Sequence, residues 1–480
     1  MKNAKKLILV LAVAAFVFAC VACGKDGGDT KTTPTPTTAA PTSATTDVVT
    51  PTEAPRDLKG LEVSIIDWWS DENWNAANNN YQIAYFDMLN DAMEKYNFKF
   101  TRKNCGVDWG QVAEQCMLSI TDGNPWGSII TLDNTWVAGL LNTGAFTDVA
   151  KVSTINWSDE KFNQSAIKAM TAGDAIYGFA AGFEPRTGVF LNGKLFKQAG
   201  LDVSAIYDLQ AQGKWTWDEL YKFAKQLTRD TNNDGQTDIW GITGQNTVFF
   251  NALMYTNGTD MITGSADGKL NMNSGDAKIT EALTWGRKFY DDGYFRNSTE
   301  EEDAAGQWDF FKTAFGKQEV AMYVEEEYAI NDIHTRGLTE EIGFVVFPYG
   351  PSAGKQIVIC RENILFVPSC ESTKKDVEDI LFAYNIYTDV PEDYKNDEER
   401  FLAQYENLFP DDERAVKETI LGILTNKWDS YMTVTTMIPN FAPDYLYALG
   451  GRTAVVSEIL EENIPKWTEQ VNEFNAKYNQ

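Results

Sequence analysis

The sequence predicts an α/β fold with two lobes, in which mixed, mostly parallel sheets are flanked by helices. Short runs of β-branched and aromatic residues alternate with amphipathic segments, which is typical of parallel sheets. After residue 57 the chain continues to residue 480, which is longer than one hydrophobic core usually supports. We therefore expect two lobes, and a content of 43% hydrophobic and 13% aromatic residues indicates a globular sequence.

Strand and helix patterns alternate in the first lobe. Val63, Ile65 and Ile66 predict a first strand, and apolar residues three to four apart within 83–96 predict a helix. The same reasoning predicts strands at 98–104 and 128–132, and helices at 111–120 and 136–141.

Further elements are expected after residue 176. The run 215–228 puts Trp217, Leu220 and Phe223 on one helical face, with Thr216 as the N-cap. Another helix is expected at 195–200, and strands are expected at 176–183, 187–192, 320–324, 343–348, 356–360 and 363–368.

The first residues predict an exported lipoprotein. Lysines precede an apolar run at 7–19, which is shorter than the roughly 20 residues that a membrane-spanning helix needs. The signal ends in Cys-Val-Ala-Cys-Gly, which resembles a bacterial lipobox, so we expect a signal peptide at 1–22 and a lipid on Cys23. Cys20 is an alternative attachment site, and an ordinary cleaved signal that frees the protein is a second alternative.

A tether is predicted at 23–57, and the whole chain is acidic. The tether is rich in Thr and Pro and buries too little apolar surface to offset the entropy lost on ordering.

The formal charge of −28 repels nucleic acid and anionic headgroups. His334 is the only histidine, which argues against Ser-His-Asp chemistry, and no Cys-x-x-Cys pair has zinc spacing. Four other cysteines fit either buried thiols or disulfides: Cys105, Cys116, Cys360 and Cys370.

A series of strings follows the tether in a fixed order: SITDGNPWGSIITLDNTW, LLNTGAFTDVAKV, IYGFAAGFEPRTGVFLNGKLFKQAGLD, WTWDELYKFAKQLT, NNDGQTDIWGI, FGKQEVAMYV and GFVVFPYGP. Together they resemble the family 1 extracellular solute-binding proteins, relatives of maltose-binding protein that serve ABC importers. The resemblance implies a type II periplasmic-binding-protein fold, in which the chain crosses a hinge between the two lobes and a ligand is held between them. It also implies a monomeric, non-enzymatic protein that passes a carbohydrate, such as an oligosaccharide, to the transmembrane subunits of an ABC permease.

The resemblance also gives bounds for the lobes. Lobe one is predicted at 58–183 and 360–430, and lobe two at 188–358 and 431–480. The charged stretch 389–414 departs from shorter members of the family and is interpreted as an insertion in a lobe.

Ligand-binding residues are expected beyond the carboxyl ends of the strands, where open α/β sheets bind ligands. A sugar needs flat aromatic surfaces and planar polar groups, and the loops after the first and third strands offer both. The candidates are Trp68, Trp69, Asp71, Asp133, Asn134 and Trp136. The alternative is that the tryptophans fill the core and the carboxylates cap helices.

Further candidates lie at the hinge crossings and on lobe two. The resemblance puts Glu184 where the family often has a ligand-contacting acidic residue, with Arg186 beside it and Arg361 at the second crossing. A hinge salt bridge fits the first pair equally well, whereas guanidinium groups at both crossings would suit an acidic sugar. Tyr323 and Glu325 stand where relatives carry a Gly-Trp pair, and the alternative is that the glutamates here form a solvated face.

The segment 230–241 has the spacing of an EF-hand loop. The oxygen ligands would be Asp230, Asn232, Asp234, Gln236 and Asp238. The bidentate glutamate expected at the end of the loop is replaced by Gly241. A structural Ca²⁺ and a metal-free turn fit this pattern equally well, and no cofactor is required for the expected function.

Two other functions fit the same composition. A secreted carbohydrate-active enzyme needs two carboxylates about 5 to 10 Å apart, and Glu184 with a glutamate at 325–327 would be the pair, although no hydrolase signature is present. A receptor subunit that presents its ligand to a membrane sensor would look the same in sequence as one that serves a permease. We expect a lipid-anchored binding protein on the outer face of the cell membrane.

Overall fold

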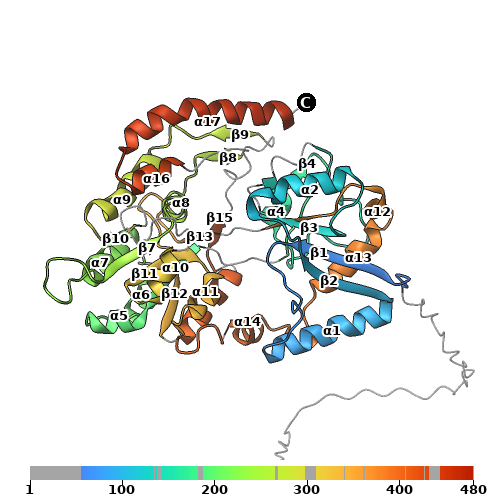
Figure 1. Cartoon of the computed structure of the whole chain (residues 1–480), viewed down its shortest axis with the longest axis horizontal. Helices are drawn as coiled ribbons and strands as arrows, with labels where there is room; N and C mark the ends of the chain where they lie inside the picture. Colours follow the sequence, from blue (N-terminus) through green and yellow to red (C-terminus); the bar gives the residue numbers. More distant parts are fainter. Residues whose placement is uncertain are drawn as a thin grey trace, which may run out of the picture. The chain divides into compact units, whose positions relative to one another are not determined.

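The computed structural model describes residues 56–133, 136–137, 143–181, 187–264, 269–297, 310–339, 341–359, 363–405, 407–425, 427–431 and 444–478. They all belong to one compact unit, Pro55–Gln480, in which helices and strands alternate (Figure 1). No helix in these ranges is long and apolar enough to cross a membrane. The predicted signal peptide lies outside the described residues, as do Cys23, Asn134, Glu184, Arg186 and Arg361.

The first sheet has four strands in the order β14–β3–β1–β2. β1 (Leu61–Asp67) pairs in parallel with β2 (Phe98–Asn104) and with β3 (Ile129–Leu132), and β14 (Ile364–Phe366) pairs antiparallel with β3. These strands confirm the strand positions that the sequence predicts for the first lobe.

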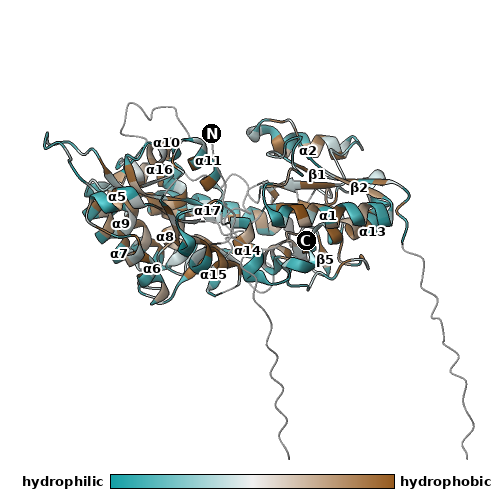
Figure 2. Ribbon diagram, turned by 90° about the horizontal axis from the view of Figure 1, so that it is seen from below, coloured by the Kyte–Doolittle hydropathy of each residue, from teal (hydrophilic) through white to brown (hydrophobic). Residues whose placement is uncertain are grey.

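Helices cover both faces of this sheet. Because side chains alternate along a strand, Val63 and Ile65 of β1 face one hydrophobic cluster and Ile66 faces another. The helices that contribute to these clusters are α1 (Asn80–Tyr96), α2 (Val112–Thr121), α4 (Gln164–Ala169) and α13 (Val377–Tyr387). Helices such as α1 carry both hydrophobic and hydrophilic residues (Figure 2). We call this part, at 56–181 and 363–388, lobe one.

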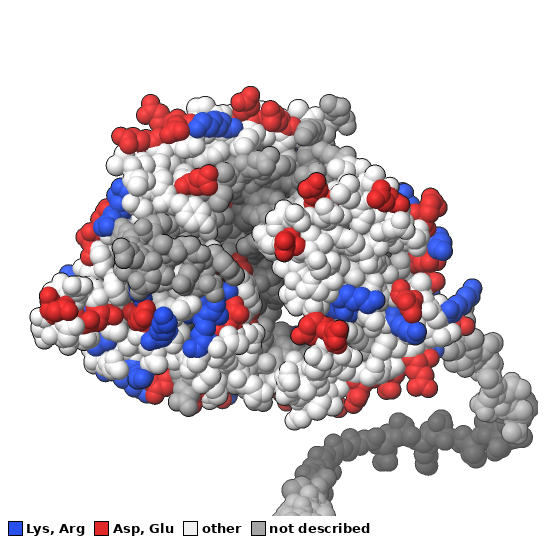
Figure 3. Space-filling model, viewed as in Figure 1, with Lys and Arg blue, Asp and Glu red and all other residues white. Residues whose placement is uncertain are grey.

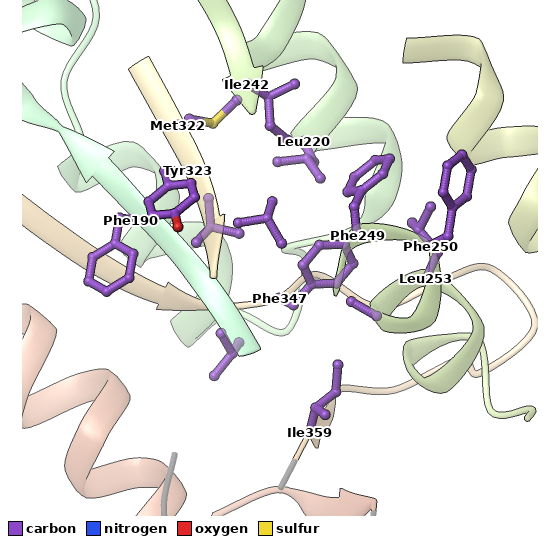
Figure 4. Close-up of a cluster of buried hydrophobic side chains, with 14 of the residues drawn as sticks. Phe190, Leu220, Ile242, Phe249, Phe250, Leu253, Met322, Tyr323, Phe347 and Ile359 are labelled. Atoms are coloured by element: carbon purple, nitrogen blue, oxygen red, sulfur yellow. The ribbon is translucent and has the colours of Figure 1, made fainter. Parts of the chain in front are cut away.

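The second sheet has five strands in the order β10–β7–β11–β6–β12. Its central strand, β11, runs parallel to β7 and antiparallel to β6. The strands are β6 (Thr187–Asn192), β7 (Trp240–Gly244), β10 (Phe295–Arg296), β11 (Val320–Glu326) and β12 (Ile342–Val346). One large hydrophobic cluster surrounds this sheet, and Figure 4 shows Tyr323 beside Phe190 within it. We call this part lobe two.

Helix α7 (Trp217–Leu227) of lobe two follows its predicted pattern. It begins after Thr216 and buries Trp217, Leu220 and Phe223, although the side chain of Thr216 makes no capping hydrogen bond. The indole of Trp215 donates a hydrogen bond of 2.8 Å to the carbonyl of Val346. Other helices of lobe two are α5 (Gly193–Gln198), α6 (Ser204–Ala211), α8 (Asn246–Thr256), α9 (Ala277–Asp291), α10 (Phe310–Gly316), α11 (Ala329–Thr335), α16 (Asp444–Gly450) and α17 (Val456–Tyr478).

Short elements connect or extend these layers. They are η1 (Trp109–Gln111), β4 (Thr171–Ala172), β5 (Ala175–Ile176), β8 (Ile262–Gly264), β9 (Leu270–Met272), β13 (Ile357–Ile359), α12 (Glu371–Lys374), η3 (Glu392–Tyr394), α14 (Asp397–Tyr405), η4 (Ala415–Ile420), α15 (Leu421–Leu424) and β15 (Asp429–Tyr431). The strand predicted at 176–183 is wrong in extent, because beyond β5 only Phe179 and Ala181 make isolated bridges.

The chain enters lobe two earlier than the predicted bound at residue 430. Phe409, Val416 and Ile420 belong to the hydrophobic cluster of lobe two. The hydroxyl of Tyr207 donates a hydrogen bond of 2.9 Å to Asp412, which ties this segment to α6. The predicted bound is therefore wrong, since the apolar residues between 408 and 424 pack around the second sheet.

The charged stretch interpreted as an insertion contains a crossing between the lobes instead. Helix α14 contacts α1 of lobe one and η4 of lobe two. Tyr394 of η3 makes an edge contact with Tyr81 of α1, with ring centroids 5.3 Å apart. We call residues 389–405 and 407–408 the third crossing, because the sequence predicts two others, near Glu184 and near Arg361.

The surface is acidic. The chain carries 69 acidic and 41 basic residues, and the face seen in Figure 3 has side chains of both signs scattered among uncharged ones. Such a net charge keeps a protein soluble and repels polyanions.

Candidate ligand-binding site

The parallel strands of lobe one bring three loops to one edge of the sheet. β1, β2 and β3 run in the same direction, so their carboxyl ends meet there. β14 runs the other way and pairs Ile364 with Leu132, so β14 begins at the same edge. The predicted residues of lobe one follow these strand ends, and Arg361, which lies outside the described residues, precedes β14.

Four tryptophans form a cluster at this edge. Trp68 lies 4.7 Å from Trp69, 5.3 Å from Trp109 and 5.1 Å from Trp136, measured between ring centroids. Trp109 and Trp136 are 4.2 Å apart. Trp69 is 48% exposed and Trp109 is 52% exposed, so the tryptophan cluster presents a broad aromatic surface to solvent. The structure thus brings together Trp68, Trp69 and Trp136, as the sequence predicts.

Sequence reasoning missed Trp109. It belongs to η1, directly before α2, and follows a strand whose last residues, Arg102 to Asn104, are polar. The signal that could have identified it is its position after the second of three parallel strands, which is the rule that selects Trp68 and Trp136.

Asp67 holds the turn that carries Trp68 and Trp69. Its buried carboxylate accepts hydrogen bonds from the backbone N–H of Trp69 at 3.0 Å and of Ser70 at 2.6 Å. It also accepts from the Ser70 hydroxyl and from the Arg102 guanidinium, both at 2.6 Å. A buried carboxylate with this many donors fixes the local backbone, because losing one partner leaves a polar atom unpaired.

The predicted carboxylates of lobe one play different parts. Asp71 is exposed, and its carboxylate accepts a hydrogen bond of 2.7 Å from the backbone N–H of Asn73. Asp133 is buried, and its carbonyl accepts a hydrogen bond of 2.9 Å from the backbone N–H of Trp136. Asp71 is therefore accessible from solvent, whereas Asp133 lies at the base of the loop that orients Trp136.

In lobe two, β11 leads to the first crossing. Glu326 at the end of β11 pairs with Thr187, the first residue of β6. Thr187 directly follows the segment that holds Glu184 and Arg186, which the structure does not describe. The carboxyl end of β11 therefore lies beside the place where the chain enters lobe two.

The structure puts Tyr323 and Glu325 inside lobe two, with exposed fractions of 0% and 2%. The hydroxyl of Tyr323 donates to Glu325 Oε2 at 2.8 Å, and the backbone N–H of Glu326 donates to Oε1 at 3.0 Å. Burial, and next the charge of Glu326, raise the pKa of Glu325 from 4.5 to about 7. The solvated-face interpretation is wrong, because residues 325–327 are all buried. The aromatic ring offered to solvent here is Tyr328, at 45% exposed.

The EF-hand-like loop is closed by its own hydrogen bonds. Asp230 accepts from the backbone N–H of Asn233 at 2.6 Å and of Gly235 at 2.8 Å. The hydroxyl and backbone N–H of Thr231 donate to Asp238, and these bonds lower the pKa of that carboxyl. Among the described residues, no group of three or more His, Cys, Asp or Glu is arranged to hold a metal ion. The calcium site therefore stays a prediction.

Gly241 shows why the last ligand of an EF-hand loop is missing. It lies in β7, and a Cβ atom added there would collide with the backbone of Ala224 in α7. Close packing of α7 on β7 therefore requires glycine at this position, and no glutamate can occupy it.

The fold is similar to solved substrate-binding proteins. An ABC substrate-binding protein from Listeria monocytogenes in complex with cycloalternan has a TM-score of 0.59 at 15% identity, covering 88% of this chain and 99% of that one. The GacH receptor of Streptomyces glaucescens has a TM-score of 0.60 at 15% identity, covering 86% and 99%. The cyclic alpha-maltosyl-1,6-maltose binding protein from Arthrobacter globiformis has a TM-score of 0.59 at 16% identity, covering 88% and 100%. These likenesses confirm the two-lobed type II fold.

A family model agrees with the resemblance drawn from the sequence. The model of the bacterial extracellular solute-binding proteins matches residues 87–364, which is more than half of the chain. No curated protein sequence matches. The matched residues run from α1 through both sheets to β14, and the chain belongs to the bacterial extracellular solute-binding protein family.

Proposed function

We propose that the protein captures a carbohydrate, such as an oligosaccharide, and delivers it to an ABC importer. The observation that carries this proposal is the tryptophan cluster, with Trp69 and Trp109 half exposed at the strand ends of lobe one. The apolar face of a sugar ring packs on such rings, and polar groups nearby bond to its hydroxyls. Related structures hold cycloalternan or acarbose, which supports the same class of ligand here.

Binding is proposed to close the two lobes around the sugar. A ligand that contacts both lobes only in the closed form shifts the equilibrium toward that form. Tyr328, exposed beyond the end of β11, is the aromatic residue that we propose for the lobe-two side. Scattering with and without ligand should show compaction, and an unchanged radius at saturation would contradict this step.

The protein is proposed to bind without catalysis and without a required cofactor. The hydrolase alternative needs a glutamate of 325–327 as acid or base. Both carboxylate oxygens of Glu325 already accept hydrogen bonds inside lobe two, which supports binding alone. Incubation of the purified protein with oligosaccharides should leave them intact, whereas their cleavage would revive the enzyme hypothesis.

We propose that the protein acts as a monomer on the outer face of the cell membrane, held by a lipid on Cys23. The lipobox-like sequence and the Thr/Pro-rich tether support this. Cys23→Ser should move the protein from the membrane fraction to the medium, and Cys20→Ser serves as the control. Membrane retention of Cys23→Ser with release of Cys20→Ser would move the anchor to Cys20.

A thermal-shift screen tests the choice of ligand. A ligand at 100 times its Kd that binds only the native state adds about 2.7 kcal/mol of stability, which raises Tm by several degrees. The panel should include mannotriose, maltotetraose, acarbose and a uronate oligosaccharide, with amino acids and peptides for comparison. Shifts with sugars support the proposal, and shifts with amino acids or peptides alone would overturn it.

A further inference from the structure

Arg102 of β2 joins three parts of lobe one that are far apart in sequence. Its guanidinium donates to Asp67 Oδ2 at 2.6 Å and to the hydroxyl of Tyr387 at 3.2 Å. Its Cζ atom lies 5.5 Å from the ring centroid of Trp69. One planar cation therefore contacts the turn that carries the tryptophan cluster, the face of a half-exposed ring and the last residue of α13.

The Tyr387 end of this link is held firmly. Its ring stacks on Phe100 with centroids 4.5 Å apart and an angle of 11° between planes. Its carbonyl accepts a hydrogen bond of 2.6 Å from the hydroxyl of Tyr85. The third crossing starts two residues later, so Tyr387 lies where the chain leaves lobe one.

The chemistry of arginine suits this link. The side chain of Arg102 is 23% exposed and that of Asp67 is fully buried. A planar guanidinium can bond to two partners and stack on an aromatic ring together, which a lysine cannot do. Its Nε atom is buried without a hydrogen-bond partner among the described residues. Burying a donor in this way costs stability, and a positioning role accounts for that cost.

We propose that Arg102 is a positioning residue for the tryptophan cluster and that, through Tyr387, it couples Trp69 to the third crossing. When the crossing moves as the lobes close, the guanidinium transmits the movement to the turn held by Asp67. The effect of this coupling on ligand affinity rests on the proposed sugar binding. The effect of Arg102 on the position of Trp69 can be measured without any ligand.

Fluorine NMR of protein labelled with 5-fluorotryptophan tests the positioning. The resonances of Trp69 and of the buried Trp215 are assigned by replacing each with phenylalanine. Tyr387→Phe removes only the hydroxyl that accepts from Arg102, and Arg102→Lys removes the planar group. Both variants should shift or broaden the Trp69 resonance and leave Trp215 unchanged. Tyr447→Phe, exposed on α16 of lobe two, removes a hydroxyl away from this link and should leave the Trp69 resonance in place.

Titration with the oligosaccharide that gives the largest thermal shift tests the coupling. Through the proposed coupling, loss of this hydrogen bond should raise Kd about fivefold in Tyr387→Phe. The Tm of the ligand-free protein should fall by a few degrees as well, because the bond is present without ligand. An unchanged Trp69 resonance in Tyr387→Phe would overturn the positioning role, even if Arg102→Lys does not fold. A moved resonance with an unchanged Kd would overturn the coupling. A moved resonance with no sugar binding at all would leave the positioning role standing and refute the proposed function instead.

Discussion

Glu325 is a buried carboxyl whose ionisation should lower the stability of the folded protein. Its pKa in the folded chain is about 7, raised from 4.5 first by burial and then by the charge of Glu326. In the unfolded chain it ionises near 4.5, so between these values the folded state holds the proton more tightly. The stability that the protonated carboxyl contributes is therefore fully present below pH 4.5 and is lost as the pH rises through about 7.

The size of this loss follows from the pKa difference. A difference of one in pKa corresponds to about 1.4 kcal/mol, so the change from 4.5 to about 7 corresponds to roughly 3 kcal/mol. Glutamine has the shape of the protonated carboxyl and cannot ionise. We therefore compare the free energy of unfolding of Glu325→Gln with that of wild type at two pH values. Relative to wild type, the variant should be roughly 3 kcal/mol more stable at pH 8 than it is at pH 4.5. Comparing two pH values cancels any constant cost of glutamine in packing.

Urea unfolding followed by circular dichroism gives the free energies at both pH values. The control is Glu473→Gln on α17, which removes the same charge from an exposed position and should change little between them. If Glu325→Gln keeps the same difference from wild type at both pH values, within about 0.5 kcal/mol, the argument from burial is refuted.

Three further outcomes are expected. Trp109→Ala should weaken sugar binding by about tenfold, as loss of a stacking ring predicts, with little change in Tm. Leu118→Ala changes a similarly exposed residue on α2 and should bind sugar like wild type. If both variants lose the same amount of sugar affinity, Trp109 is not part of the site. Gly241→Ala should destabilise the fold by about 1 to 3 kcal/mol through its clash with Ala224. Gly275→Ala should leave the stability unchanged, because nothing lies within 4 Å of the added Cβ. Urea unfolding measures the free energy of unfolding of both variants. Because the EF-hand-like loop is closed by its own hydrogen bonds, Ca²⁺ and EDTA should give the same Tm, and a rise with Ca²⁺ would show that the loop rearranges to hold the ion.

The local patterns in the sequence were sufficient for the first sheet, for β6, β11 and β12 of the second sheet, and for three of the four clustered tryptophans, but they missed β7 and β10. Short apolar runs mark β1 and β3 because side chains on both faces of these strands enter hydrophobic clusters. The rule that ligands bind at carboxyl ends then selects Trp68, Trp69 and Trp136. Trp109 was missed although its strand was predicted correctly at 98–104, because candidates were sought only in the loops after the first and third strands.

Two other errors share one cause, which is that charge in a sequence does not report burial. The three glutamates at the end of β11 look solvated, but Glu325 finds Tyr323 and a backbone N–H as partners and is buried with them. The third crossing looks like a surface insertion because charged residues surround the apolar ones. Phe409 and Val416 reach the core of lobe two only through contacts with distant elements, which no local pattern records.

The antiparallel pairing of β14 with β3 has a consequence for how the chain matures. β14 completes the edge of a sheet whose other strands lie within the first 132 residues. The second lobe draws core residues as late as Phe474. The core of each lobe can therefore be completed only after synthesis has passed well beyond the middle of the chain. This order suits the export that we propose, because neither lobe can complete its core until its late elements have been made.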